Sequence, residues 1–365
     1  RVDFSQAPFL VIWETTRSCG LACAHCRASA ILGRDPRELS TSEGKALLAD
    51  ASQMGCPIFI LSGGDPLNRP DLDELIAHGK RVGLRMGTIP AATDSLTEWR
   101  VRLLKDAGLD QMALSLDGPD AALHDGFRGE PGAFDLTIRA AGWARAAGLP
   151  LQINTVLAEW NLPYLERMVE LVSSLGIVFW EVFFLIPVGR GGALRSITAE
   201  QFEEVFERLH RLNAERDFVI KLTEAPHYRR FVIQKETAGG GAVAERVTRV
   251  IARPRGVGGS LGLSPEAVNA GKGFVFVDHL GNVCPSGFLP IETGNVRERP
   301  LSELYREHPV FLKLRDPKAL KGKCGACEFA RICGGSRARA AAVTGDPLGS
   351  DPYCEYQPRL AGALQ

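Results

Sequence analysis

The feature that most constrains this chain is a repeated alternation of apolar strand-like segments with amphipathic helix-like segments. The strand-like segments are residues 9–16, 58–63, 84–89, 111–116, 151–157 and 178–186. The helix-like segments are residues 42–54, 72–82, 98–107, 133–147, 162–175 and 198–216. Such alternation indicates a parallel sheet with helices packed outside it. Because the strand-like segments are too few for a closed eight-stranded barrel, we predict an open, partial (β/α)6 barrel.

The pattern weakens after residue 216. Glycine-rich stretches at 239–241 and 256–262 bracket a segment that we expect to be a linker or cover. A hairpin-like segment at 274–285 and a helix-like segment at 301–314 come later. We therefore predict a barrel of residues 1–216, a linker or cover of residues 217–272 and a smaller C-terminal domain of residues 273–365.

Charge and hydropathy exclude several classes of partner. Lys plus Arg and Asp plus Glu number 43 each, so the formal net charge is zero. With this balance the chain has no excess of basic residues with which to bind nucleic acid or an anionic membrane. No apolar run is long enough to span a bilayer, and residues 1–7 do not form a signal peptide. We expect a cytoplasmic protein that binds neither nucleic acid nor membrane.

Cysteines are numerous and unevenly placed. Of the nine, three lie within residues 19–26, five lie within residues 284–354, and Cys56 stands alone. A secreted disulfide framework would spread its cysteines through a small chain. Tight groups of cysteines indicate metal ligands instead, and we expect the isolated Cys56 to be a buried apolar residue.

The first group, Cys19, Cys23 and Cys26, has the spacing CxxxCxxC and directly follows the first expected strand. An ordinary [4Fe–4S] cluster takes four thiolates, so three leave one iron with an open position. The alternatives are a zinc knuckle or cysteines that merely pack. A zinc site would need a fourth ligand, and His25 is badly placed to share a metal with the adjacent Cys26.

Glycines and polar residues follow the other expected strands at their C-terminal ends. They are Gly63, Gly64, Asp65, Ser115, Asp117, Asn154 and the segment 187–190. In αβ-barrels this face carries the active site. The alternatives are an ordinary glycine turn at Gly63–Gly64 and a buried Asn154 that caps its strand. Chance packing residues would not all gather at one rim, so we predict a site there.

With these motifs the chain resembles the radical S-adenosylmethionine (SAM) superfamily across nearly all of its length. The resemblance implies a [4Fe–4S] cluster on Cys19, Cys23 and Cys26, whose open iron chelates the amine and carboxylate of SAM. Reductive cleavage then gives a 5′-deoxyadenosyl radical that abstracts hydrogen from a substrate. It also implies an electron donor such as reduced flavodoxin or ferredoxin.

The same resemblance implies roles for the residues at the strand ends. Gly63, Gly64 and Asp65 match the Gly-Gly-Glu-Pro motif that holds the SAM amino group, with Asp65 where Glu is commoner. Roles at the SAM ribose, carboxylate and adenine fall to Ser115, Asp117, Arg128, Asn154 and His25. The alternatives are a surface arginine at Arg128 and an exposed loop histidine at His25.

The second group has four thiols, which make a closed site. Its members are Cys324, Cys327, Cys333 and Cys354. It resembles the SPASM extension of radical SAM enzymes, which binds auxiliary [4Fe–4S] clusters. Ser336 and Arg299 stand where further cysteines are expected and Cys284 is left alone, so we predict one auxiliary cluster. The alternative is a structural zinc site.

The C-terminal motifs at residues 284–290, 294–297 and 333–340 resemble those of the branch that makes haem d1 and alternative haem. Members of that branch convert propionate side chains to vinyl groups with loss of carbon dioxide. Residues 224–230, including His227, Arg229 and Arg230, would suit such a ligand, although a basic surface helix is the alternative. A second hypothesis is a peptide-modifying SPASM maturase. Such enzymes often carry a leader-binding domain, for which the first strand at Phe9 leaves no room. A third is a non-catalytic iron–sulfur protein.

Overall fold

Nine strands form one sheet in the order β7-β6-β5-β4-β3-β2-β1-β8-β9. The computed structural model describes residues 2–238 and 267–358. All neighbouring strands are parallel except the last pair, β8 and β9. The strands are β1 (Leu10–Glu14), β2 (Ile58–Ser62), β3 (Arg85–Thr88), β4 (Gln111–Ser115), β5 (Leu151–Leu157), β6 (Phe179–Phe184), β7 (Val219–Thr223), β8 (Phe274–Val277) and β9 (Val283–Cys284).

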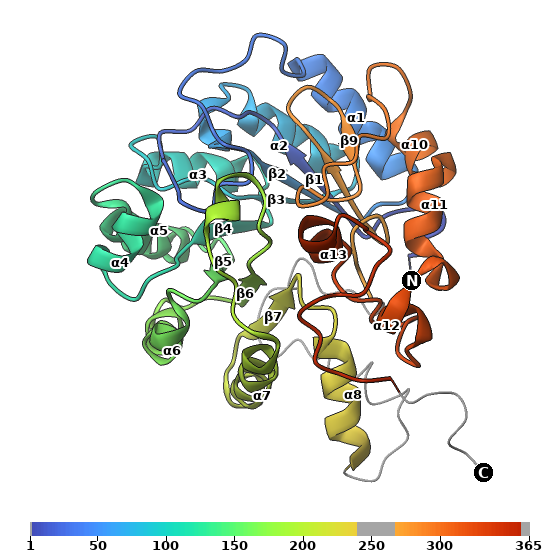
Figure 1. Ribbon diagram of the computed structural model, residues 1–365. Helices are drawn as coiled ribbons and strands as arrows, with labels where there is room; N and C mark the ends of the chain where they lie inside the picture. Colours follow the sequence, from blue (N-terminus) through green and yellow to red (C-terminus); the bar gives the residue numbers. More distant parts are fainter. Residues whose placement is uncertain (1, 239–266, 359–365) are drawn as a thin grey trace, which may run out of the picture.

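Helices cover the outer face of the curved sheet (Figure 1). They are α1 (Thr41–Gln53), α2 (Leu72–Arg81), α3 (Glu98–Asp106), α4 (Ala121–Arg128), α5 (Ala133–Ala146), α6 (Leu165–Ser174), α7 (Ala199–Glu215) and α8 (Tyr228–Ala238). The C-terminal helices are α10 (Leu301–Glu307), α11 (Pro309–Arg315), α12 (Gly322–Ala326) and α13 (Arg337–Thr344). Helix α10 packs on α1, whereas Ser336 at the start of α13 bonds to Glu224 after β7. Short 3-10 turns occur at Pro66–Asn68, Leu162–Tyr164, Gly189–Ala193 and Pro317–Ala319.

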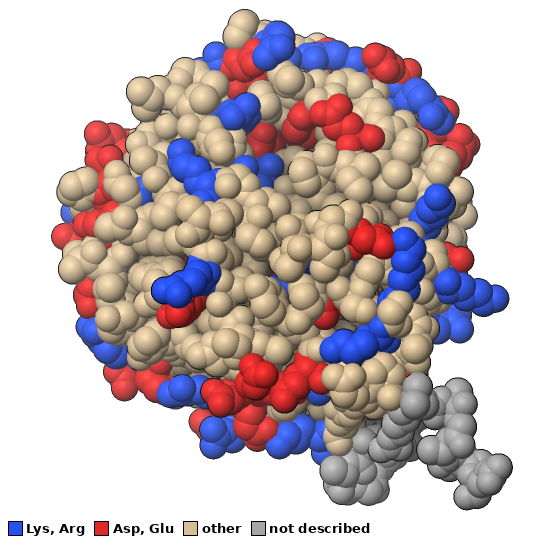
Figure 2. Space-filling model, viewed as in Figure 1, with Lys and Arg blue, Asp and Glu red and all other residues tan. Residues whose placement is uncertain are grey.

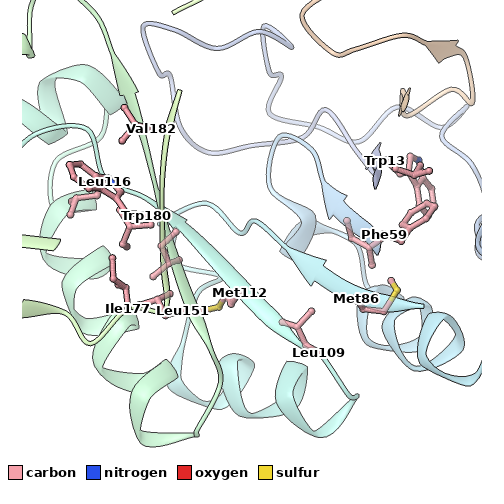
Figure 3. Close-up of a cluster of buried hydrophobic side chains, with 14 of the residues drawn as sticks. Trp13, Phe59, Met86, Leu109, Met112, Leu116, Leu151, Ile177, Trp180 and Val182 are labelled. Carbon is pink, nitrogen blue, oxygen red and sulfur yellow. The ribbon is translucent and has the colours of Figure 1, made fainter. Parts of the chain in front are cut away.

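The main hydrophobic core lies between the sheet and these helices. Buried side chains such as Trp13, Phe59, Met86, Met112 and Trp180 point outward from the strands toward the helices (Figure 3). Because side chains alternate along a strand, their neighbours in sequence point to the barrel interior. The outer face therefore supplies the packing energy, and the inner face is free to carry polar groups.

The six strands and six helices predicted for the barrel are confirmed. Ser40 and Glu43 form a capping box at the start of α1. The predicted hairpin is also confirmed as β8 and β9. The single helix predicted for residues 301–314 is wrong: it is two helices, α10 and α11, because Pro309 cannot donate a backbone hydrogen bond and starts a new helix. The glycine-rich stretches at 239–241 and 256–262 lie outside the described residues.

Three strands, β7, β8 and β9, extend the sheet beyond the six predicted for the barrel. Strand β7 pairs with β6, and β8 pairs with β1 in parallel. β7 falls within the range expected to be a linker or cover, and β8 within the expected C-terminal domain. Strand β7 is short and carries the charged Lys221 in a half-buried run, so its sequence lacks the apolar pattern by which the other barrel strands were predicted. The division into 1–216, 217–272 and 273–365 stays a prediction.

Helix α1 packs unusually close to β1 at Gly44. A β-carbon at this position would lie 2.6 Å from the Trp13 ring and 3.0 Å from Leu75 of α2. Both of these side chains are fully buried, so neither can swing into solvent. The absence of a side chain at Gly44 therefore sets the distance between this helix and the sheet.

Replacing Gly44 by alanine is expected to destabilise the fold by about 1–3 kcal/mol, because overpacking forces buried neighbours to shift. Gly142 in α5 offers a matched control, since a β-carbon there meets nothing within 4 Å. Gly142→Ala should instead stabilise the chain by about 0.5–1 kcal/mol through helix propensity. Anaerobic thermal unfolding of the three proteins measures both effects, and equal shifts for the two variants would contradict this account.

The loop after β4 is held by a buried histidine from α4. The Asp117 backbone N–H donates to His124 Nδ1 at 3.1 Å, and His124 is 1% exposed. Burial, assisted by the nearby Arg128 charge, lowers the pKa of His124 to about 4. The folded protein therefore holds this imidazole neutral at pH values where an unfolded chain would protonate it.

This histidine predicts acid destabilisation in a defined pH window. In the unfolded chain His124 takes up a proton below its ordinary pKa of 6.5, whereas in the folded chain it does so only below about pH 4. Stability therefore falls as the pH drops through that range. His124→Asn keeps an acceptor for the Asp117 N–H and removes the titration. Its loss of unfolding free energy between pH 7 and pH 5 should be about 2 kcal/mol smaller than that of wild type. Anaerobic urea titrations at the two pH values test this, and parallel pH profiles would refute it.

Candidate active site

The three N-terminal cysteines lie on one loop, residues 15–32, which we call the cysteine loop. It leaves the C-terminal end of β1 and closes on itself, because the Cys19 N–H donates to the Ile31 carbonyl at 2.9 Å. Cys19 and Cys23 are buried, Cys26 is half-buried, and none of the three forms a disulfide. The thiols are therefore gathered on a fixed backbone and are available as ligands.

Hydrogen bonds tie this loop to the loops after β2 and β6 and to the C-terminal end of α4. The loop after β2 donates from Gly64 to Thr16 and from Asp65 to Ser18, each at 2.7 Å. At the end of α4, the carbonyls of residues 127 and 128 accept from residues 24 and 22 of the cysteine loop. After β6, Arg190 donates its backbone N–H to the Cys26 carbonyl at 3.1 Å and its side-chain Nε to the Cys23 carbonyl at 2.9 Å. The motifs expected at one rim do lie together there.

Two glycines permit the close approach of these loops. A β-carbon on Gly64 would lie 2.5 Å from the Ser18 carbonyl oxygen, and one on Gly189 would lie 2.4 Å from that of Arg27. In both cases the obstacle is backbone, which cannot rotate away. Gly189 also has φ of +55°, which disfavours a side chain. Glycine is therefore required at both contacts with the cysteine loop.

The surroundings of the three thiols suit iron–sulfur ligation. N–H groups point at each sulfur: Leu21 N to Cys19 Sγ at 3.3 Å, Ala30 N to Cys26 Sγ at 3.5 Å, and Arg128 Nη1 to Cys23 Sγ at 3.7 Å. Hydrogen bonds to the sulfurs are one of the means by which proteins tune such clusters. Burial raises the pKa of the Cys19 thiol to about 11, so a bound metal would be needed to keep it deprotonated.

The Asp65 carboxylate is already fully engaged by the protein. It accepts from Thr93 Oγ1 at 2.7 Å, from the Leu67 N–H at 3.1 Å and from the Ala91 N–H at 3.3 Å, and it is completely buried. Burial raises the pKa of this carboxyl. In this structure the side chain therefore fixes the loop after β2, and the backbone of Gly63 and Gly64 is the part that faces the cysteine loop.

Asp117 and Arg128 form a buried ion pair beside the cysteine loop. Burial opposes ionisation of Asp117, but the Arg128 charge holds the pKa of the carboxyl below its ordinary value. The other Asp117 oxygen accepts from the Val156 N–H at 2.7 Å. Arg128 is 8% exposed, so the surface-arginine alternative is wrong. The pair places one guanidinium next to Cys23.

His25 also has a defined place. Its ring stacks on Phe127 at 4.8 Å between centroids, with the planes 2° apart, and Phe127 stacks in turn on Trp160 at 4.4 Å. Burial lowers the pKa of His25 to about 4, so the ring is neutral near pH 7. The exposed-loop alternative is therefore wrong. The stack presents aromatic faces at the rim, which is the surface that a purine base requires.

Ser115 and Asn154 begin a row of polar side chains that crosses the inner face of the sheet. The strand register aligns Ser115 with Asn154, Asn154 with Glu181, and Glu181 with Lys221. Asn154 accepts from Gln152 Nε2 at 2.6 Å, and Glu181 accepts from Gln152 at 2.8 Å and from Lys221 Nζ at 2.7 Å. Sequence reasoning missed Glu181 and Lys221. Their signal was present as single charges inside otherwise apolar strands.

A cavity of about 680 Å³ lies against this row inside the barrel. Its wall includes Asn154, Glu181 and Lys221 on one side and Ile12 and Ile60 on the other. A volume of this size, mostly apolar with a few polar groups, is typical of a small-molecule site. The cavity reaches Asn154, one strand away from Ser115 at the rim.

The four C-terminal cysteines line a second cavity together. Cys324, Cys327, Cys333 and Cys354 all border it, with His227 and Arg230. Cys324 Sγ accepts from Arg337 Nη2 at 3.5 Å and from the Asp351 N–H at 3.4 Å, and Cys333 Sγ accepts from the Gly335 N–H at 3.4 Å. Among the described residues, no three Cys, His, Asp or Glu side chains lie close enough together to bind a single metal ion in this structure.

Residues that replace or adjoin the expected cysteines have structural partners. Ser336 caps α13 and donates to Glu224 at 2.6 Å, while Arg299 pairs with Glu303. Cys284 is buried in β9 and is not among the residues that line the four-cysteine cavity. Cys56 is buried and donates to the Ile58 carbonyl, as expected of an apolar cysteine.

The alternative that residues 224–230 form a basic surface helix is wrong for the middle of the segment. His227 is completely buried, with Asp351 at 3.8 Å, and Arg230 pairs with Glu203. Burial lowers the pKa of His227 to about 3. The segment packs against the four-cysteine cavity, and Arg229 lines the barrel cavity. It therefore joins the two sites.

On the face shown in Figure 2, positive and negative side chains are interspersed, so no large area of this face carries one sign of charge. Among the described helices, none has both the length and the apolar character needed to cross a membrane.

Comparisons with known proteins agree with this arrangement. The family model described as "Radical SAM superfamily" matches residues 13–172. The AdoMet-dependent heme synthase of Methanosarcina barkeri is 39% identical over 98% of this chain and 99% of its own length. The PqqA peptide cyclase of Methylocella silvestris is 30% identical over 96% of this chain and 88% of its own.

A solved structure shares the fold. Streptococcus suis SuiB bound to S-adenosylmethionine superposes with a TM-score of 0.73 at 17% identity, over 96% of this chain and 78% of that chain. The cysteine loop, the rim motifs and these similarities lead to one conclusion. The chain belongs to the radical SAM superfamily and is an enzyme that uses a [4Fe–4S] cluster and S-adenosylmethionine.

Proposed function

We propose that this radical SAM enzyme converts propionate side chains of an iron porphyrin to vinyl groups. The observation that carries the proposal is the 39% identity to an AdoMet-dependent heme synthase over 98% of the chain. The barrel cavity supports it, because its volume and mixed lining suit an apolar body with polar substituents.

The proposed reaction balances as follows. The 5′-deoxyadenosyl radical removes one hydrogen atom from the propionate carbon attached to the ring and becomes 5′-deoxyadenosine. The adjacent carbon–carbon bond to the carboxylate then breaks, releasing carbon dioxide and forming the vinyl double bond. One electron is left over and passes to a one-electron acceptor of the iron–sulfur class. Cys19, Cys23 and Cys26 of the cysteine loop would hold the cluster, which when bound would supply the electron for SAM cleavage.

For the binding of SAM we propose the residues gathered at the rim. The backbone of Gly63 and Gly64 would hold the amino group, and Arg128 the carboxylate, with Asp65 fixing the loop. Ser115, Asp117 and Asn154 would face the ribose side. His25 would lie against the adenine, since its ring belongs to the aromatic stack with Phe127.

We further propose one auxiliary [4Fe–4S] cluster on Cys324, Cys327, Cys333 and Cys354. Its support is the shared cavity and the N–H groups that point at two of the sulfurs. A reduced flavodoxin or ferredoxin is the proposed electron donor, and the cytoplasm the proposed location.

A peptide substrate is the second candidate. It is favoured by the 30% identity to a PqqA peptide cyclase. A peptide would bring its own backbone polar groups into the barrel, whereas a porphyrin would bring a large apolar plane. Binding measurements with both kinds of ligand separate the two.

The cluster assignment predicts a defined iron content. Anaerobic reconstitution should give about two [4Fe–4S] clusters per chain, because three and four thiolates serve them. The double variant Cys324→Ser, Cys327→Ser should retain about one cluster and still show the SAM-binding cluster by electron paramagnetic resonance. Cys23→Ala should lose dithionite-dependent 5′-deoxyadenosine formation. Zinc in the anaerobically purified protein, or 5′-deoxyadenosine from Cys23→Ala, would contradict the respective assignment.

The substrate assignment predicts a spectroscopic signal. Titration of the reconstituted enzyme with iron coproporphyrin III, an iron porphyrin that carries four propionates, should shift the porphyrin Soret band and saturate. With SAM and dithionite, mass spectrometry should show products lighter by one carbon dioxide and two hydrogens per converted side chain. A saturable peptide complex without any Soret shift would favour the second candidate instead.

A further inference from the structure

All charged side chains among the described residues that line the barrel cavity lie on one of its walls. They are Glu181 of β6, Arg216 at the end of α7, Lys221 of β7, Glu224 between β7 and α8, and Arg229 of α8. The facing wall comes from β1, β2 and β8 and its strand residues are apolar: Leu10, Ile12, Ile58, Ile60 and Phe274. The cavity is therefore divided into an apolar half and a charged half.

The charged wall carries more cations than anions. The Glu181 carboxylate already accepts hydrogen bonds from other residues of the protein. One Glu181 oxygen accepts from Lys221 Nζ at 2.7 Å and also from Thr223, while the other accepts from Gln152 at 2.8 Å. This fixes the Lys221 ammonium at the cavity surface. An ammonium has three N–H donors, and Glu181 takes one of them.

Arg216 adds a second donor to the same wall. It stands at the C-terminal end of α7, and its Nε is buried without a hydrogen-bond partner among the described residues. A buried donor without a partner costs free energy, and a ligand acceptor would recover that cost. A carboxylate is the acceptor that a guanidinium binds best.

We propose that Lys221 and Arg216 anchor carboxylates of the substrate while its apolar body packs on Ile12, Ile60 and Phe274. This inference rests on the proposed function and deepens it, since an iron porphyrin with propionates has such an apolar plane with acidic substituents. The wall selects anionic planar ligands over cationic ones, because burying a cation beside Lys221 would add like-charge repulsion.

The register shows which carboxylate is anchored. Lys221 lies three strands from Ser115 in the same row, roughly 14 Å along the sheet at the usual spacing between strands. Ser115 is at the rim where we propose that SAM binds. Lys221 therefore holds a carboxylate remote from the reacting one, and its role is to orient the ring rather than to take part in the bond-breaking step. It is a positioning residue.

The test is a set of Soret titrations on the reconstituted enzyme. One probe is iron coproporphyrin III, and the other is an iron porphyrin that carries N-methylpyridinium groups instead of carboxylates. Lys221→Met should weaken coproporphyrin binding about tenfold or more, as expected for a lost hydrogen bond to a charged group, without weakening the cationic probe. Arg216→Met should act in the same direction, and Lys221→Arg should restore most of the affinity.

The control is Lys235→Met. Lys235 is an exposed lysine of α8 that pairs with Glu207 and does not line the cavity, so its loss should change neither titration. Iron content and melting temperature show whether each variant folds; if Lys221→Met does not fold, Lys221→Arg and Arg216→Met carry the test.

The outcomes distinguish this inference from the proposed function. Equal affinity of the wild type, Lys221→Met and Arg216→Met for iron coproporphyrin III would overturn the anchor and leave the proposed function standing. Wild-type enzyme that binds no porphyrin but does bind an acidic peptide would overturn both.

Discussion

The active site depends on the backbone hydrogen bonds that join the cysteine loop to the loops after β2 and β6 and to the end of α4. Because neighbouring strands of the barrel are parallel, all of their carboxyl ends open at one rim, and loops distant in sequence meet there. Main-chain contacts, such as Gly64 to Thr16 and Arg190 to Cys26, fix the loop without using the side chains that a cofactor needs. The thiols can therefore be rigid in position and still free as ligands.

The barrel divides its two faces between stability and function. Outward-facing residues such as Trp13 and Trp180 pack under the helices, while inward-facing positions of the same strands carry Asn154, Glu181 and Lys221. Period-two alternation makes this separation possible, because adjacent residues point to opposite faces. A buried polar row is costly unless its members satisfy one another, and here Gln152 links Asn154 to Glu181.

The barrel cavity and the four-cysteine cavity are joined through one segment, residues 224–230. Glu224 bonds to Ser336 of the C-terminal region, His227 lies against Asp351, and Arg229 reaches the barrel cavity. A substrate in the cavity is thus one short segment away from the four-cysteine site. This arrangement suits the proposed reaction, which leaves one electron to be passed on.

The sequence by itself determined the alternation of strands and helices, the cysteine groups and the rim motifs, because these depend on local spacing and on residues adjacent to a strand end. Tertiary structure decided what depends on distant partners. It added β7 to the sheet, engaged Asp65 with the segment 91–93, paired Asp117 with Arg128, and buried His227. Only the register across β4 to β7 could align Ser115, Asn154, Glu181 and Lys221, since these residues are far apart in the chain and meet only through hydrogen bonding between strands.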